Sequence, residues 1–261
     1  MGIAVVTGAS SGIGREFALQ IGNEEGIEEL WAIARRRERL QDLIPQCRAR
    51  VRVLELDLLR DDSLEKLERL LKKEAPQIVY LVNGAGFGLF GAFEALSLKE
   101  QLDMIALNVG ALTALTHLCL PYMQRGGRIF QMSSLSAFQP LPFVGVYGAG
   151  KAYVLRFSRA LNRELRPKKV GVTAVCPGWT KTAFFDRAAN SDAVCVYDFF
   201  FTPARVVTKA LADGKKGRDL SVCGLSVYLK LLLSKVLPHR LIMKLWCLQQ
   251  KKEGLFGEKR T

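Results

Sequence analysis

Short apolar runs separated by helical patterns recur along the chain. The runs are rich in Val, Ile and Leu without clean alternation, as strands buried on both faces of a parallel sheet should be. They occupy residues 3–7, 30–34, 51–56, 78–82, 128–132 and 170–175, with a seventh candidate at 219–223. The segments between them predict helices at 12–24, 36–45, 62–74, roughly 98–124, 147–165 and 203–213. This alternation predicts an α/β fold with a doubly wound, mostly parallel sheet of about seven strands and helices on both faces.

Two basic amphipathic segments follow the last predicted strand. We expect residues 1–224 to form the sheet domain and residues 225–261 a helical C-terminal extension of it, serving as a lid or an interface. The apolar stripe of the first segment is Leu225, Tyr228, Leu231 and Leu232, and that of the second is Leu241, Ile242, Leu245 and Trp246. Basic amphipathic helices can lie on anionic membranes, cover a substrate pocket or form an oligomer contact, and the sequence leaves all three open.

The charge of the chain is concentrated in this extension. Apolar residues make up 49% and charged residues 24%, which is ordinary for a soluble globular protein, but the net charge is +13. Residues 215–261 hold eleven Lys or Arg against three Asp or Glu, so they supply eight of the thirteen net charges. Because no nucleic-acid-reading motif accompanies this charge, we predict no nucleic-acid partner.

Cysteine and histidine usage predicts neither a metal site nor disulfides. The six cysteines are scattered without a C-x-x-C pair, and neither histidine has a metal-ligand neighbour at useful spacing. We therefore expect reduced thiols in a cytoplasmic protein. No signal peptide fits before IAVVTG, and no run of eighteen uncharged apolar residues predicts a membrane span. Peripheral membrane contact through the extension is the alternative that stays open.

A glycine-rich turn follows the first predicted strand, in the sequence TGASSGIGREFAL. Gly8, Gly12 and Gly14 lead into a helix, and glycines there let the backbone approach a pyrophosphate at the helix N-terminus. The spacing is G-x-x-x-G-x-G, and no G-x-x-x-x-G-K-[ST] motif of an NTPase occurs. The turn therefore predicts a Rossmann-type dinucleotide site.

The end of the second predicted strand indicates which dinucleotide binds. An acidic residue there would bind the ribose 2′-OH of NAD, but the sequence reads AIARRRERL. Ala34 leaves room, and Arg35, Arg36 and Arg37 offer guanidinium groups suited to a phosphate. Cations are unfavourable at a helix N-terminus, and a bound 2′-phosphate would offset this. We therefore expect NADP(H) to be preferred over NAD(H).

The stretch VYGAGKAYVL places Tyr147 and Lys151 one helical turn apart on one face. Two glycines and an alanine separate them, and such small residues allow close contact with the helix backbone. The contacting partner is a neighbouring helix, a cofactor or both.

Taken in order, these and other motifs resemble the short-chain dehydrogenase/reductase family over roughly residues 3–223. The matching motifs are TGASSGIG at 7–14, Asp57-Leu58, NGAG at 83–86, Asn108 in IALNVGAL, MSSLSAF at 132–138, Tyr147-x-x-x-Lys151 and PGWTKT at 177–182. Ser134 lies thirteen residues before Tyr147, the usual interval in the family. Gly84 stands where the family has a second Asn, which is a mild departure.

The resemblance implies an NADP-dependent oxidoreductase acting on CH–OH groups, assembled as a homodimer or homotetramer. Its implied catalytic residues are Asn108, Ser134, Tyr147 and Lys151. Its implied cofactor residues are Gly8, Ser10, Ser11, Gly12, Ile13, Gly14, Arg35, Arg36, Asp57, Leu58, Asn83, Gly84, Ala85, Tyr147, Lys151, Pro177, Gly178, Thr180 and Thr182. A non-catalytic NADP(H)-binding sensor or scaffold is the alternative, and the complete Asn-Ser-Tyr-Lys set counts against it.

Carbonyl reduction needs a hydride on carbon, which the nicotinamide carries, and a proton on oxygen. A tyrosine has a pKa near ~10, and a neighbouring ammonium lowers it. We therefore expect Lys151 to lower the pKa of Tyr147, which then acts as general acid/base, while Ser134 hydrogen-bonds the substrate oxygen. By resemblance alone, Lys151 also holds the nicotinamide ribose, and Asn108 holds a water linking Lys151 to solvent.

The substrate is expected to be a small hydrophobic ketone or secondary alcohol, because no Arg or His stands out as a carboxylate anchor. The predicted pocket wall is Leu135, Phe138, Leu141, Phe143, Val146, Phe184 and Phe185. The segment 184–201 carries five phenylalanines and is interpreted as a lid, a piece of core or an interface. A membrane-surface reductase of lipid-like substrates is a further alternative.

Overall fold

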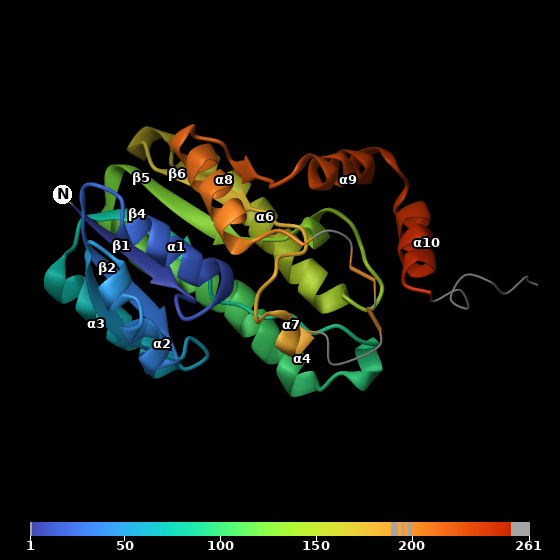
Figure 1. The fold of residues 1–261 in the computed structure, drawn as a ribbon, viewed down its shortest axis with the longest axis horizontal. Helices are drawn as coiled ribbons and strands as arrows, with labels where there is room; N and C mark the ends of the chain where they lie inside the picture. The colour runs from blue at the N-terminus through green and yellow to red at the C-terminus, as the bar shows by residue number, and fades with distance from the viewer. Residues whose placement is uncertain (1, 189–192, 195, 198–199, 252–261) are drawn as a thin grey trace, which may run out of the picture.

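The computed structural model describes residues 2–188, 193–194, 196–197 and 200–251 of the 261-residue chain. Its strands are β1 Gly2–Thr7, β2 Ile27–Ala34, β3 Arg50–Glu55, β4 Ile78–Asn83, β5 Met123–Met132, β6 Gly171–Val175 and β7 Leu220–Ser221. They form one sheet in the order β3-β2-β1-β4-β5-β6-β7, and every neighbouring pair is parallel (Figure 1). The predicted doubly wound sheet is confirmed.

Helices pack on both faces of this sheet (Figure 1). They are α1 Gly12–Gly22, α2 Arg37–Gln41, α3 Asp61–Glu74, α4 Leu98–Ile105, α5 Leu112–Cys119, α6 Gly145–Glu164, α7 Phe185–Ala188, α8 Pro203–Lys215, α9 Leu225–Val236 and α10 His239–Gln249. Two separate cores result: α1 and α8 pack on one face, and α3, α5 and α6 on the other. Val6 belongs to the first core and its neighbour Val5 to the second. Because both faces are covered, β1, β2 and β4 contain consecutive apolar residues, whereas the edge strand β3 alternates polar and apolar positions.

The topology places the loops that follow β1, β4 and β5 at one edge of the sheet. Chain order reverses at β1, since β2 and β3 lie on one side of it and β4 to β7 on the other. Thr7 at the end of β1 is aligned with Asn83 of β4, and Asn83 with Gln131 of β5. The loops that leave these carboxyl ends therefore meet, which is where open α/β sheets bind ligands.

Two predicted helices differ from the observed ones. The segment predicted at 36–45 is α-helical only at Arg37–Gln41 and continues as a 3-10 turn, Ile44–Gln46, because Pro45 has no N–H to donate to an α-helical bond. The helix predicted at 98–124 is interrupted by a π-helical segment, Ala106–Ala111. That helix ends at Tyr122, and β5 begins at Met123, where the sequence pattern had predicted a strand only from residue 128.

Among the described residues, the helix Leu98–Tyr122 is the one that is long and apolar enough to cross a membrane by length and composition, where the sequence had predicted none. Core helices of soluble proteins pass the same test. Leu115 and Cys119 of this helix are buried in the core between the sheet and α3.

Helices α9 and α10 follow β7, as the sequence predicted. Figure 1 shows them at the end of the molecule opposite β2 and α3. The Trp246 indole N–H donates to the Pro142 carbonyl at 3.0 Å, which fixes α10 against the loop before α6. The Gln250 side chain both accepts from and donates to the backbone of Val196, at 2.9 and 3.1 Å. The predicted division at residue 224 stays a prediction, because both helices share a cavity with the sheet loops.

Candidate active site

A cavity of 770 Å³ lies over the carboxyl ends of the strands. Every predicted cofactor residue except Asn83 lines it: Gly8, Ser10, Ser11, Gly12, Ile13, Gly14, Arg35, Arg36, Asp57, Leu58, Gly84, Ala85, Tyr147, Lys151, Pro177, Gly178, Thr180 and Thr182. The cavity therefore joins a glycine-rich end to the end that holds Tyr147 and Lys151. It is large enough for a dinucleotide's reactive half together with a substrate.

The glycine turn leaves no room for side chains. A Cβ on Gly14 would lie 2.4 Å from the Gly8 carbonyl oxygen, and one on Gly8 would lie 2.7 Å from the backbone of Gly84. Gly8 also has a φ of +70°, which disfavours other residues. The Thr7 hydroxyl binds the turn to the next loop, accepting from the N–H groups of Gly84 and Ala85 at 3.1 and 3.2 Å. The bare backbone at the start of α1 is the surface that a pyrophosphate needs.

Two of the three consecutive arginines line this end of the cavity. Arg36 donates to the Ser10 hydroxyl at 3.1 Å. Its pKa is lowered by burial and by the nearby charges of Arg39 and Arg35. Arg37 does not line the cavity and lies 3.9 Å from Glu55. The neighbouring guanidinium groups of Arg35 and Arg36 favour the binding of an anion in the cavity. A 2′-phosphate could accept hydrogen bonds from both.

Asn83 is a correction to the predicted cofactor set. Its side chain is buried and donates to the Thr116 hydroxyl at 3.0 Å and to the Gln131 carbonyl oxygen at 2.9 Å. It lies in the terminal position of β4 and points into the core between the strands and α5, where these two hydrogen bonds hold its amide nitrogen. Gly84 and Ala85, directly after it, face the cavity instead.

Asn108 lies in the π-helical segment and outside the cavity lining. Its amide donates to the Phe87 carbonyl at 2.7 Å and accepts from the Phe87 N–H at 3.0 Å. A Cβ on Gly86 would lie 2.6 Å from the Asn108 oxygen and 3.7 Å from the Lys151 ammonium nitrogen. Asn108 thus fixes the loop that passes beside Lys151. π-Helical turns often occur at functional sites for such reasons.

Lys151 lines the cavity, but its side chain is largely buried. Its Nζ donates to the Met132 carbonyl at 2.8 Å and lies 5.5 Å from the centre of the Tyr147 ring. The Ser133 hydroxyl donates to the Lys151 carbonyl, also at 2.8 Å. Burial lowers the pKa of Lys151 to about 8. The two side chains expected on one helix face are therefore adjacent, as predicted.

The acidity expected for Tyr147 is not what the structure gives. Burial raises the pKa of Tyr147 to about 12, and a hydrogen bond with the Ser134 side chain lowers it only in part. The ring centre of Phe184 lies 5.6 Å and that of Phe90 6.0 Å from the Tyr147 ring, so apolar groups surround the phenol. Here the loss of hydration outweighs any effect of the nearby ammonium.

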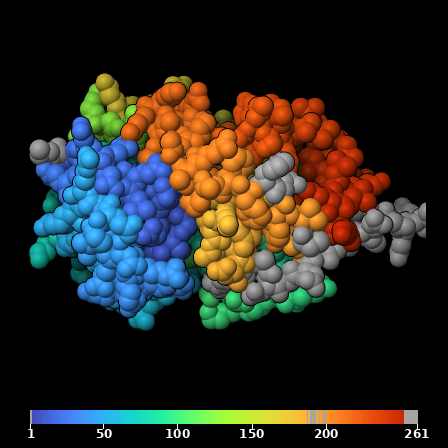
Figure 2. Space-filling view, viewed as in Figure 1, coloured from blue at the N-terminus to red at the C-terminus, as the bar shows by residue number. Residues whose placement is uncertain are grey.

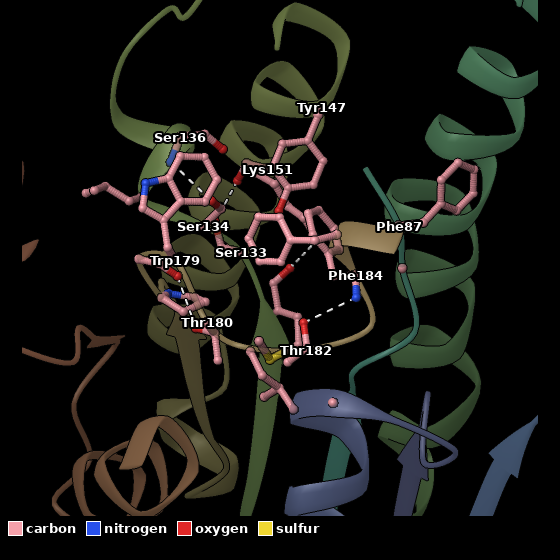
Figure 3. A pocket seen from close by; sticks show the side chains of 18 of the residues that line it. Phe87, Ser133, Ser134, Ser136, Tyr147, Lys151, Trp179, Thr180, Thr182 and Phe184 are labelled. Atoms are coloured by element: carbon pink, nitrogen blue, oxygen red, sulfur yellow. Dashed lines mark hydrogen bonds between the residues drawn. The ribbon is translucent and has the colours of Figure 1, made fainter. Parts of the chain in front are cut away.

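Ser134 lines the cavity beside Tyr147 and Lys151 (Figure 3). Its Oγ accepts from the Ser136 N–H at 3.2 Å and so caps the 3-10 turn Leu135–Phe138. The hydroxyl therefore both shapes the local turn and lies close to the tyrosine. Ser134, Tyr147 and Lys151 come from two different elements that the sheet brings together.

An aromatic cluster forms the other end of the cavity. Phe90 and Trp179 are 6.2 Å apart between ring centres, and Phe184 and Phe185 are 5.6 Å apart. Leu135, Leu141, Phe184 and Phe185 line the cavity as predicted. Phe138 does not, because it packs against Leu155 and its neighbours. Phe143 and Val146 also stay outside the lining and pack behind it.

Several lining residues were not predicted from the sequence. They are Phe87, Phe90, Gln139 and Trp179 from loops and Val227, Lys230, Leu233, Ile242, Leu245 and Trp246 from α9 and α10. Trp179 lies inside the PGWTKT motif and Phe87 directly follows NGAG, so proximity to those motifs was an available signal. For α9 and α10 the apolar stripes left a pocket cover open as one role, but which residues line the cavity depends on how the two helices fold back. Of the segment 184–201, residues 189–192, 195 and 198–199 lie outside the described residues, and with them part of the predicted lid.

Within the described part of the chain, no three His, Cys, Asp or Glu side chains gather as metal ligands. Cys47, Cys119, Cys176, Cys223 and Cys247 are free thiols, and Cys195 lies outside that part. Burial raises the pKa of Cys119 and of Cys176 to about 12, which keeps both unreactive.

Comparison with known proteins gives consistent matches. The short chain dehydrogenase family model matches residues 2–193. The probable short-chain type dehydrogenase/reductase VdlC of Helicobacter pylori is 29% identical over 260 residues, covering 90% of this chain and 93% of that protein.

Solved structures are similar over the whole chain. A short-chain dehydrogenase from Sphingobium yanoikuyae in complex with NADPH has a TM-score of 0.77 and 29% identity, covering 100% of this chain and 97% of that one. The bulky-bulky ketone specific alcohol dehydrogenase from Comamonas testosteroni has a TM-score of 0.73 and 28% identity, covering 100% and 96%. Structures of this fold hold NADPH, NADP or NAD, so the fold alone does not select the cofactor.

Proposed function

Because the chain belongs to the short-chain dehydrogenase/reductase family of oxidoreductases, we propose that it interconverts hydrophobic ketones and secondary alcohols with NADP(H). One observation carries this proposal. Ser134, Tyr147 and Lys151 line the same cavity as the glycine turn and Arg36. When bound there, a nicotinamide supplies the hydride, and the protein supplies the proton and holds the substrate.

Tyr147 is the general acid of the proposed reduction. With a pKa of about 12 its phenol is protonated at neutral pH and has a proton to give to a carbonyl oxygen. The Lys151 ammonium favours the phenolate that remains, and the Ser134 hydroxyl holds the substrate oxygen. Asn108 acts as a positioning residue through Phe87. Its link to solvent through water rests on the family resemblance.

The preference for NADPH rests on Arg35 and Arg36. Both line the cavity, and the acidic residue that would bind a ribose 2′-OH is absent at the end of β2. The similar protein from Sphingobium yanoikuyae is in complex with NADPH. NAD would leave these crowded guanidinium groups without an anion.

A hydrophobic substrate fits the aromatic end of the cavity. Phe90 and Phe184 lie beside the Tyr147 ring and Trp179 packs on Phe90, and α9 and α10 add Val227, Ile242 and Leu245. The similar protein from Comamonas testosteroni is described as a bulky-bulky ketone specific alcohol dehydrogenase. A homodimer or homotetramer in the cytoplasm is the accompanying prediction.

The test is a substrate screen that follows NADPH absorbance with steroids, aliphatic ketones and aromatic ketones. The matched variants are Tyr147→Phe and Tyr153→Phe. Tyr153 lies on the same helix, is exposed and hydrogen-bonds Thr113 at 3.1 Å. Tyr147→Phe should lose roughly 10²–10⁴-fold in rate, while Tyr153→Phe should keep full activity. If wild type and Tyr147→Phe reduce every ketone equally, Tyr147 is not the acid; if neither reduces any but both bind NADPH, a binding protein replaces the enzyme.

A further inference from the structure

Helix α9 is apolar on two opposite sides. Val227 and Leu231 face the protein and are buried. At 3.6 residues per turn, Leu229, Leu232 and Val236 lie on the far side. All three are exposed, Val236 by 81%. This side of α9 is accessible to solvent, and in water the exposure of apolar side chains is unfavourable.

Helix α10 repeats the arrangement. Ile242 and Trp246 are buried against the protein, whereas Leu241, Leu245 and Leu248 are exposed. These three leucines follow the i, i+4, i+7 spacing of one helix face. Figure 2 shows α9 and α10 (red) together forming one end of the molecule. The exposed leucines of both helices therefore lie at that end of the molecule.

The charge around these faces has one sign. Residues 225–251 contain Lys230, Lys235, Arg240, Lys244 and Lys251 and no Asp or Glu. On α9, Lys230 and Lys235 flank the exposed apolar side. On α10, Arg240 and Lys244 lie beside the leucines. Lysine and arginine at the borders of an apolar face can reach anionic headgroups while the leucines enter the acyl boundary.

A second exposed apolar face provides the contrast. Helix α4 exposes Leu98, Leu102 and Ile105, but the same helix carries Glu100 and Asp103, and Lys99 pairs with Asp103 at 2.6 Å. Carboxylates there would be repelled by an anionic lipid surface, whereas a protein surface can pair with both signs. Charge therefore separates the two faces, and only the α9–α10 face complements anionic lipid.

The cavity reaches this same region. Leu233 of α9 and Leu245 of α10 both line it, yet they are 55% and 51% exposed. Lys230 and Leu237 also line it. Residues of both helices that line the cavity are therefore accessible to solvent, at the end of the molecule that α9 and α10 form.

We propose that the exposed faces of α9 and α10 dock on an anionic lipid bilayer and that the substrate end of the cavity opens toward that bilayer. A lipid-soluble substrate then enters from the membrane without crossing water. This second part depends on the proposed ketone–alcohol activity, whereas the docking itself does not.

Flotation of the purified full-length protein with vesicles tests the docking directly. One set of vesicles is phosphatidylcholine alone, and the other contains about 30% phosphatidylglycerol, which supplies the anionic surface. The wild type should float with the anionic vesicles and stay in solution with the neutral ones. Leu229→Glu/Leu232→Glu should lose at least roughly tenfold in bound fraction, because two leucines leave the interface and two negative charges enter it. Neither residue lines the cavity.

The matched control is Leu98→Glu/Leu102→Glu on α4, which should float as the wild type does. Circular dichroism and NADPH binding show that each variant is folded. Absence of wild-type flotation on anionic vesicles, or equal flotation of the α9 variant, overturns the proposal. So does a smaller oligomer for the α9 variant on size exclusion, since the face would then join subunits.

Activity distinguishes the two proposals. With a lipid-soluble ketone the α9 variant should lose activity on vesicles but keep it in detergent, with an unchanged rate for a water-soluble ketone. Flotation without reduction of any ketone removes the proposed activity and leaves the docking in place. If the wild type and the α9 variant reduce the vesicle-bound ketone equally well, substrate does not enter the cavity from the membrane.

Discussion

The two ends of the cavity are built differently. The nucleotide end consists of glycine backbone after β1 and β4, such as Gly8, Gly14 and Gly84, and of Arg35 and Arg36 directly after β2. The substrate end consists of aromatic and aliphatic side chains from loops and from α9 and α10, such as Phe90, Phe184 and Trp246. A dinucleotide always presents the same pyrophosphate, which a fixed backbone can hold. A substrate pocket is shaped by side chains from distant segments.

The largest effect on NADPH binding and stability is expected from Gly14→Ala, at the nucleotide end. Its Cβ would lie 2.4 Å from the Gly8 carbonyl oxygen, which is backbone and cannot turn away. We expect loss of NADPH binding and a destabilisation of about 1–3 kcal/mol. Gly145→Ala is the control, because a Cβ there meets nothing within 4 Å. Calorimetry and NADPH fluorescence measure both effects; normal NADPH affinity of Gly14→Ala would show that the turn is not the cofactor cradle.

The arginines at the nucleotide end should decide between cofactors. Arg35→Ala/Arg36→Ala should weaken NADPH binding by roughly 10–100-fold, the value of charge-assisted hydrogen bonds, and change NADH binding little. Arg37→Ala serves as the control, since Arg37 lies beside Glu55 and outside the cavity. Fluorescence titration with both cofactors is the measurement. Tighter NADH than NADPH binding by the wild type would refute the preference.

The pH dependence should report on Lys151, where the two ends meet. Its pKa is lowered from 10.5 to about 8, so the ammonium is present below that pH and lost above it. The kcat/KM for ketone reduction should fall about tenfold per pH unit above ~8. A flat profile from about pH 6 to about pH 10 would contradict a role for the charge.

The same pKa shift should make the folded protein more stable as pH rises, whereas the activity should fall. Between pH 8 and 10.5 the unfolded chain holds a proton on Lys151 that the folded chain has released, so this residue makes the free energy of unfolding rise with pH. Denaturant unfolding of wild type and Lys151→Met isolates the effect as the difference between the two proteins. An equal pH slope for both would remove Lys151 as its source.

The smallest effect is expected at the aromatic end. Phe184→Ala removes the ring centred 5.6 Å from Tyr147 and lets water reach the phenol. The KM for bulky ketones should rise a few-fold because an apolar wall contact is lost, and the pKa of Tyr147 should move down from about 12, with NADPH affinity unchanged. Phe93→Ala, an exposed phenylalanine outside the cavity, is the control. Substrate kinetics and ultraviolet titration of the phenol measure the two outcomes; unchanged KM values would separate Phe184 from the substrate.

Local sequence determined the sheet, the strand ends and nearly the whole nucleotide end. Strands buried on both faces must be apolar throughout, and a backbone that approaches a phosphate must be glycine, so both leave signals within a few residues. Asn83 and Phe138 show the limit of this reasoning. Each lies in or beside a matching motif, yet the direction of its side chain is set by packing against Thr116 and Leu155.

Only the tertiary structure decided the acidity of Tyr147 and the wall of the substrate end. The sequence placed an ammonium one turn from the phenol, but the pKa depends on how many apolar groups exclude water there, and Phe90 and Phe184 come from other loops. The role of α9 and α10 followed the same rule. Their amphipathic pattern was visible, but which side faces the cavity and which faces outward depends on where the chain folds back. Hydration and packing are sums over neighbours distant in sequence, and a local pattern does not contain them.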